Sequence, residues 1–169
     1  MLALLTPRLV NVLIFVLCVI AMIIVYYLDG VLGLAPCPLC MTQRVFVVGA
    51  GIAALLAALH GPGAMGRRIY AAIGLLSAGV GGAVAARHVW LQHLPEDQVP
   101  ACGPDLEYML ENFPFTETLQ LILMGDGNCA EVVWTFMGLS IPEQALLLFL
   151  GLVAANLWQL VRREPFSTP

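Results

Sequence analysis

Four long apolar segments constrain this chain more than any other feature, because each is long enough to cross a lipid bilayer. They lie at about residues 9–28, 42–60, 69–91 and 141–161, and a helical span needs ~20 residues. Backbone N–H and C=O groups in lipid must be paired within their own segment, which only helices achieve here. We therefore expect an all-α membrane protein, with a four-transmembrane-helix bundle forming one integral membrane domain over residues 1–169.

The composition excludes a soluble globule and a nucleic-acid-binding protein. Hydrophobic residues make up 60% of the chain and charged residues 11%, and there is no lysine. A soluble domain of this size needs far more charge to cover its surface. Nucleic-acid binding needs basic patches, which the sequence lacks. The first apolar segment is longer than the ~7–15-residue core of a cleaved signal peptide, so we expect it to be retained.

The arginines predict the orientation in the membrane. Five of them flank the spans on one side: Arg8, Arg67, Arg68, Arg162 and Arg163. Cytoplasmic loops carry the excess of basic residues, so both termini and the short loop 61–68 are expected in the cytoplasm. The loops 29–41 and 92–140 then face outward, and the second of them contains acidic residues but no basic one.

The cysteines are concentrated in the two outward loops. Cys37 and Cys40 lie in the first loop, and Cys102 and Cys129 lie in the second. Outside the cytoplasm disulfides form and persist, and the simplest pairing joins the two cysteines of each loop. These bonds could be structural staples or redox centres. Zinc is disfavoured because only one Cys-x-x-Cys is present, and we expect no metal. Cys18, inside the first span, is interpreted as a buried hydrophobic residue.

The Cys37-Pro38-Leu39-Cys40 motif has the composition of a redox pair at a helix start. Prolines disfavour helix at the residue before them, so the second helix is expected to begin near Cys40. The positive end of the helix then stabilises the thiolate form of Cys40. Arg44 follows one turn later on the same face. It is either an interfacial side chain that reaches toward water or a group that binds the carbonyl oxygen of a reducible ligand.

Two further polar residues stand near the outer end of the third span. His88 and Gln92 are one helical turn apart. They form either an interfacial polar belt with Trp90 or part of the wall of the same ligand pocket.

The long outward loop has structure of its own. Its apolar residues Leu106, Met109, Leu110 and Phe113 recur at i, i+3, i+4 and i+7, which predicts a short helix on the membrane surface. Residues 125–128 form a Gly-Asp-Gly-Asn turn signal. We expect that turn to present Cys129 in an accessible position suited to thiol exchange.

Taken in order along the chain, these features resemble the DsbB family of bacterial inner-membrane quinone reductases. The resemblance covers almost the whole chain: four spans, Cys-x-Leu-Cys at the start of the second span, and Arg44 four residues after Cys40. It includes His88, Gln92 and the two loop cysteines. It also includes Gly127-Asn128-Cys129-Ala130-Glu131, which leads to Trp134, Phe136, Gly138, Leu139 and Pro142.

The resemblance implies a multi-pass protein of the bacterial inner membrane with periplasmic redox loops. It would reoxidise DsbA, a soluble periplasmic thiol oxidase of thioredoxin fold. Cys102 would form the mixed disulfide with that partner, and Cys129 would be its disulfide mate. Electrons would reach the Cys37–Cys40 pair through an exchange between the loops that joins Cys37 with Cys129.

The resemblance also implies a quinone cofactor, either ubiquinone or menaquinone. Cys40 would interact with the quinone ring through a charge-transfer or covalent adduct, and Arg44 would bind and polarise the ring. His88 and Gln92 would approach the same pocket. Quinol would leave into the lipid bilayer, and the quinone pool would supply the driving force for reoxidising a strongly oxidising partner.

Two positions depart from the family pattern, and two alternatives stay open. Proline follows the first thiol where valine is familiar, and Gln43 precedes the arginine where an acidic residue is common. The vitamin K epoxide reductase family shares a four-helix bundle with a Cys-x-x-Cys motif, but carries that motif at the last helix of the bundle. The other alternative is a non-catalytic membrane scaffold or metal-handling protein with stapled loops.

Overall fold

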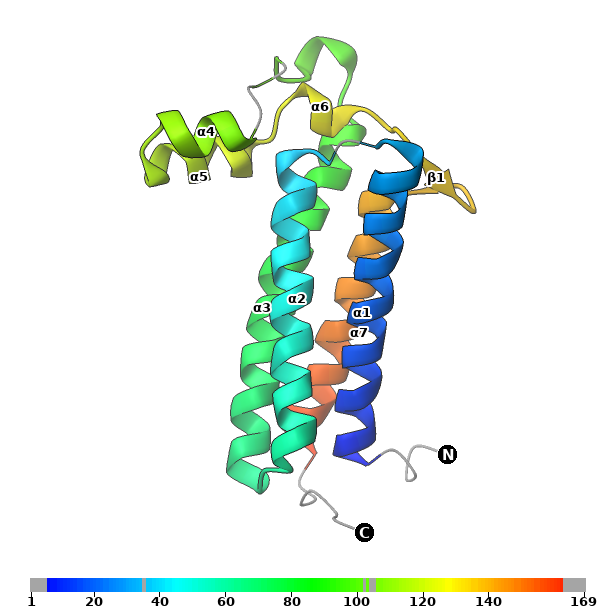
Figure 1. Cartoon of the computed structure of the whole chain (residues 1–169), viewed down its shortest axis with the longest axis vertical. Coiled ribbons are helices and arrows are strands. Elements are labelled where there is room, and N and C mark those ends of the chain that lie inside the picture. The colour runs from blue at the N-terminus through cyan, green and yellow to red at the C-terminus, as the bar shows by residue number, and fades with distance from the viewer. Residues whose placement is uncertain (1–5, 35, 102, 104–105, 163–169) are drawn as a thin grey trace.

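The computed structural model describes residues 6–34, 36–101, 103 and 106–162, so Cys102 lies outside the described residues. The elements follow in the order α1 (Pro7–Leu32), α2 (Pro38–His60), α3 (Ala64–Gln92), η2 (Glu96–Gln98), α4 (Leu106–Asn112), α5 (Phe115–Met124), α6 (Gly127–Ala130), β1 (Thr135–Phe136), β2 (Leu139–Ser140) and α7 (Ile141–Val161). Four of these helices, α1, α2, α3 and α7, are long and apolar enough to cross a membrane. The expected four-helix membrane bundle is confirmed (Figure 1).

Local sequence signals fix where these helices begin. The Thr6 hydroxyl accepts a hydrogen bond from the backbone N–H of Leu9 at 3.3 Å and caps α1. At the start of α7 the backbone N–H of Ser140 donates to the Glu143 carboxylate at 2.7 Å. Prolines occupy the first turn of α1, α2 and α7, where a missing N–H costs nothing.

The start of α2 corrects one expectation. The helix begins at Pro38, two residues before the predicted start near Cys40. The prediction is wrong because proline at the first helical position is already fixed at a helical φ and leaves no donor unpaired. Cys37 is therefore the extended N-cap residue, with φ −71° and ψ 164°.

The bundle is held together by close contacts between small and large side chains. α1 packs on α2, α2 on α3, and α3 on α7. Of the glycines in α3, Gly81 lies against the ring of Phe149, which is fully buried, and Gly74 lies against Asn156. These contacts explain Gly74 and Gly81 as positions of close helix approach. Gly79 differs, since a Cβ there would meet nothing within 4 Å.

The first and last membrane helices, α1 and α7, are joined at the end of the bundle that carries both termini. There the side-chain amides of Asn11 in α1 and Gln159 in α7 exchange two hydrogen bonds, at 2.9 and 3.2 Å. Both side chains are buried. Paired amides of this kind are the arrangement that makes polar groups tolerable inside a membrane bundle.

The long loop lies at the opposite end, which we call the loop end (Figure 1). The α4 helix covers the predicted apolar pattern as far as Asn112 and ends before Phe113, and its Met109 side chain is buried. The Thr118 hydroxyl of α5 donates to the backbone carbonyl of Met109 at 3.1 Å, which joins the two helices. Apolar side chains on α5 are exposed, among them Phe115, Leu119, Leu123 and Met124. The position of these helices on the membrane surface stays a prediction.

Candidate functional site

The candidate site begins at the first turn of α2, where the two thiols of the Cys-x-x-Cys motif stand at the loop end of the bundle. Cys37 is the N-cap residue and Cys40 lies in the first helical turn. Both thiols are half-buried. The unpaired N–H groups and the dipole at a helix start favour a negatively charged sulfur there.

His88 of α3 is the centre of the site and is 2% exposed. Its Nδ1 atom lies 3.1 Å from the Gln43 amide nitrogen and 3.9 Å from the Cys40 sulfur. Its Nε2 atom lies 3.0 Å from the backbone carbonyl of Cys129 and 3.8 Å from the Cys37 sulfur. An amide N–H donating to Nδ1 and a carbonyl facing Nε2 together assign the ring proton to Nε2.

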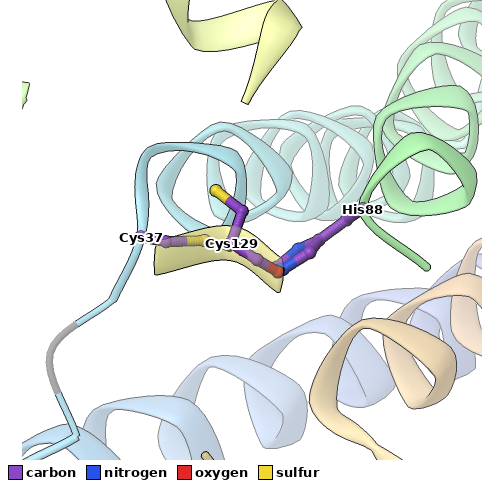
Figure 2. Close-up of side chains that lie close together, drawn as sticks. All are labelled: Cys37, His88 and Cys129. Carbon is purple, nitrogen blue, oxygen red and sulfur yellow. Dashed lines mark hydrogen bonds between the residues drawn. The ribbon is translucent and has the colours of Figure 1, made fainter. Parts of the chain in front are cut away.

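The α6 turn brings Cys129 into this group from the long loop (Figure 2). The sulfurs of Cys37 and Cys129 and a ring nitrogen of His88 lie within 4.8 Å of one another. Asp126 caps the turn by accepting a hydrogen bond from the Cys129 N–H at 3.2 Å. Three segments far apart in sequence thus meet at one cluster of sulfur and nitrogen atoms, which we call the thiol cluster.

Two contacts hold the segment that precedes α6 against the bundle. Gly125 has φ +73°, and a Cβ there would lie 2.5 Å from a methyl group of Leu91. Only glycine accommodates both the left-handed backbone and this close approach. The Arg87 guanidinium donates to the carbonyl of Met124 at 3.1 Å, the last residue of α5. The position of the α6 turn is therefore set by α3 and by the glycine that precedes the turn.

The expected accessibility of Cys129 is wrong, because its side chain is fully buried. It packs with Leu39, Val84 and Leu91 in a small core at the loop end. Hydrogen bonding with the Cys37 sulfur and burial raise the pKa of the Cys129 thiol. The Gly-Asp-Gly-Asn signal correctly predicts a turn, but a turn does not say which way its side chains face.

In reduced protein we expect Cys129 to react with iodoacetamide about tenfold or more slowly than Cys37 at neutral pH. A thiol whose pKa is raised holds less of the reactive thiolate, so the difference should narrow as pH rises. Mass spectrometry of the alkylated peptides measures both rates. In protein unfolded in dodecyl sulfate the two cysteines should react alike. Equal rates in folded protein would contradict the buried position of Cys129.

The sulfur and nitrogen atoms of the thiol cluster are also potential metal ligands. Thiolate sulfur and imidazole nitrogen are ligands that Zn²⁺ prefers. Cys37, Cys129 and His88 offer three such atoms in the described part of the chain. The ring proton on Nε2, which donates to the Cys129 carbonyl, occupies the nitrogen nearest the Cys37 sulfur. This hydrogen bonding suits a thiol and histidine site for proton transfer better than a metal centre.

An apolar cavity of about 320 Å³ adjoins the thiol cluster between α1, α2 and α7. Most of its lining is aliphatic, and Ile20 and Ile24, which are exposed on the outer surface of the bundle, form part of it. Its mouth is therefore on the lipid-facing surface. Polar groups gather at the end nearest the thiols: Asp29, Cys40, Gln43, Arg44 and Gln144.

Arg44 is tied to the end of α1 by an ion pair. Its guanidinium donates two hydrogen bonds to the Asp29 carboxylate, at 2.5 and 3.0 Å, and it lies 5.5 Å from the centre of the Tyr26 ring. Arg44 is therefore held by a carboxylate, and its binding of a ligand stays a prediction. Both members of the pair line the cavity.

The structure divides the predicted ligand-binding residues between two cavities. Cys40 and Arg44 line the large one. His88 and Gln92 line a smaller cavity of about 40 Å³, together with Cys37 and Cys40. Cys40 is the predicted site residue that borders both. The alternative of an interfacial belt with Trp90 is wrong for His88, which is buried in the thiol cluster.

Sequence reasoning does not identify Asp29 or Gln43 as site residues. Gln43 stands out in the sequence only as a departure from an acidic residue, although its place three residues after Cys40 puts it on the same side of the helix. Asp29 falls in a predicted loop, whereas it lies in the last turn of α1. The one available signal for Asp29 is a lone carboxylate at the end of an apolar span. Cys18 is buried in the bundle core, as predicted.

Known proteins match this chain over most of its length. The family described as "Disulfide bond formation protein DsbB" matches residues 7–159. Disulfide bond formation protein B of Saccharophagus degradans is 53% identical over 89% of this chain and 90% of the relative. The protein of the same name from Stutzerimonas stutzeri is 50% identical over 94% of this chain and 98% of its own length. Disulfide bond formation protein B 1 of Pseudomonas aeruginosa is 47% identical, covering 94% and 97%.

The match includes α1, α2 and α3, α7 as far as residue 159, and the three segments that form the thiol cluster. An oxidoreductase role in disulfide bond formation follows from the family, and the cluster of thiols supplies the chemistry for it. This multi-pass membrane protein belongs to the DsbB family.

Proposed function

We propose that this protein reoxidises a periplasmic DsbA-type thiol oxidase and passes the electrons to membrane quinone. The observation that carries the proposal is the position of Cys40, whose side chain borders both the thiol cluster and the lipid-facing cavity. One sulfur atom can therefore exchange electrons with thiols on one side and with a lipid-soluble acceptor on the other. The proposed setting is the bacterial inner membrane, with both termini cytoplasmic and the thiol cluster periplasmic, as the arginines predict.

The proposed electron path begins at the second loop. A thiolate of the reduced partner attacks Cys102 in a Cys102–Cys129 disulfide, and the partner leaves oxidised after its second thiol attacks the mixed disulfide. Cys102 and Cys129 then hold the two electrons as thiols. The close approach of the Cys37 and Cys129 sulfurs supports the next exchange, in which the Cys37–Cys40 disulfide is reduced through a Cys37–Cys129 bond.

His88 is the group proposed to move protons between these sulfurs. Its Nδ1 atom carries a lone pair 3.9 Å from Cys40, and its Nε2–H is 3.8 Å from Cys37. The ring can take a proton from one thiol and donate one to the other, because either nitrogen can carry it. Gln43 supports both states, since an amide can donate to Nδ1 or, after turning over, accept from it.

The large cavity fits a quinone by its chemistry. Its aliphatic walls suit an isoprenoid tail, and its polar end offers a thiol, a guanidinium and amides to a ring with carbonyl groups. When bound, a quinone supplies an acceptor for two electrons and two protons, and the Cys37–Cys40 dithiol becomes a disulfide. Arg44 is proposed to orient a ring carbonyl by hydrogen bonding, next to Cys40. His88 and Gln92 line the other cavity and act on the thiols in this proposal.

Membership of the DsbB family supports this function over a vitamin K epoxide reductase-like activity. The remaining alternative is a scaffold or metal-handling protein, which would turn over neither thiols nor quinone. It differs from the proposal in a single measurable respect, namely dependence on both a reduced thioredoxin-fold partner and a quinone.

Purified protein in detergent is expected to reduce a soluble ubiquinone analogue only when a reduced DsbA-type partner is present. The rate is followed by the loss of quinone absorbance, and a menaquinone analogue is tested in parallel. The variants Cys102→Ser and Cys37→Ser should reduce turnover about a thousandfold or more, because each removes an essential sulfur. Folded protein that turns over neither quinone would sink the proposal and favour the scaffold or metal-handling alternative.

A further inference from the structure

The ion pair between Arg44 and Asp29 carries a consequence for what the large cavity can bind. It joins the first turns of α2 to the last turn of α1, with N–O distances of 2.5 and 3.0 Å. The two side chains are only 14% and 23% exposed. Each carboxylate oxygen meets a different guanidinium nitrogen, which is the two-point geometry that arginine forms best with a carboxylate.

Without the Asp29 carboxylate, the Arg44 guanidinium would be an uncompensated cation at the polar end of an aliphatic cavity, next to Cys40. An unpaired charge in such a place is costly and attracts any available anion. The mouth of the cavity lies among exposed side chains of α1 such as Ile20 and Ile24, which face lipid.

Fatty acids are the membrane compounds best suited to enter such a cavity. They have an aliphatic chain for the walls and a carboxylate for the two-point site on the guanidinium. A quinone has a similar division into an apolar tail and a polar head, but its head is neutral. An unpaired arginine would therefore favour the anionic compound over the neutral one.

We propose that Asp29 is a specificity-determining residue, which occupies the carboxylate site of Arg44 so that the cavity accepts neutral carbonyl ligands and rejects fatty acids. Because Asp29 is part of the same chain, its effective concentration at Arg44 exceeds that of a free carboxylate in the membrane. The remaining N–H groups of Arg44 are left for a neutral acceptor, which needs one hydrogen bond and no counterion. This inference rests on the proposed function in taking a quinone as the neutral ligand.

The test compares two probes of equal chain length, palmitate and methyl palmitate, binding to purified full-length protein in detergent. Radiolabelled probes give the affinities, and comparing the palmitate-to-ester ratio between variants in the same detergent cancels the different partition of the two probes into the micelle. The wild type should bind palmitate no better than the ester. The neutral variant Asp29→Asn should favour palmitate by about tenfold or more, as expected for one charged hydrogen-bonding pair.

Further variants make the result specific. Asp29→Glu keeps a carboxylate and should continue to exclude palmitate. Asp29→Ser removes the carboxylate and should gain the palmitate preference, so it tests the inference if the asparagine variant does not fold. Adding Arg44→Gln to Asp29→Asn should abolish the gained preference, because the cation is gone. Asp97→Asn removes an exposed carboxylate that does not line the cavity, and it should behave as the wild type.

Turnover provides a second readout. Palmitate should raise the quinone KM of Asp29→Asn and leave its kcat unchanged, as expected for competition within the cavity. An unchanged palmitate-to-ester ratio in folded Asp29→Asn would overturn the inference. The binding assay contains neither quinone nor partner. Loss of palmitate exclusion in a protein that never reduces quinone would therefore retain the inference about Asp29 and reject the proposed function.

Discussion

Replacing Cys40 by serine is expected to abolish quinone reduction, by about a thousandfold or more, while the bundle remains folded. The substitution changes one atom at the border of the two cavities. A serine hydroxyl can neither form the disulfide with Cys37 nor carry electrons to an acceptor in the large cavity. The measurement is partner-dependent loss of quinone absorbance, with helicity followed by circular dichroism in the same detergent.

The matched control is Cys18→Ala, which removes a thiol that is buried in the bundle core away from the thiol cluster. Its turnover should stay within about twofold of the wild type, since that sulfur borders neither of the two cavities that Cys40 joins. Retained activity in Cys40→Ser would refute the assigned role of Cys40. Equal loss in both variants would attribute the effect to general disturbance of the bundle.

The largest expected effect on stability comes from Gly81→Leu in α3. Even a Cβ at this position would overlap two ring atoms of Phe149 and lie 2.8 Å from the Cβ of Phe46. The Phe149 side chain is fully buried, so it cannot move aside without displacing α7. Overpacking by a methyl group alone costs about 1–3 kcal/mol in a close-packed core. A leucine should therefore prevent α3 from packing on α7.

Gly79→Leu is the matched control, because it lies on the same helix and a Cβ there meets nothing within 4 Å. Thermal unfolding in detergent, followed by circular dichroism and size-exclusion chromatography, measures both variants. Gly81→Leu should lose the cooperative transition or show a much lower Tm, and Gly79→Leu should unfold close to the wild type. Similar Tm values for the two variants would show that α3 and α7 do not pack through Gly81.

The loss of packing should also remove activity, since the site depends on the position of α3. His88 lies two turns beyond Gly81 on that helix and contacts the other segments of the thiol cluster. A shift of α3 by the width of a methyl group would separate its ring from the Cys129 carbonyl, 3.0 Å away. Core packing and the thiol cluster are thus linked through one helix.

Much of the fold could be predicted from the sequence, because the signals involved are local. An uninterrupted apolar segment has to be helical in lipid whatever its neighbours are, so the four spans follow from length and composition alone. The Cys-x-x-Cys motif and the pattern 106–113 are likewise properties of short windows. The predicted start of α2 is two residues late, since a proline can end one structure or begin the next.

The sequence by itself determined the four spans, the motif at the start of α2 and the kinds of side chain available for redox chemistry. Only the tertiary structure decided that Cys129 is buried, that Gln43 pairs with His88 and that Asp29 neutralises Arg44. Apolar periodicity reports how a segment meets its solvent, whereas these contacts join side chains that are 15 or more residues apart and exist only after the helices have packed.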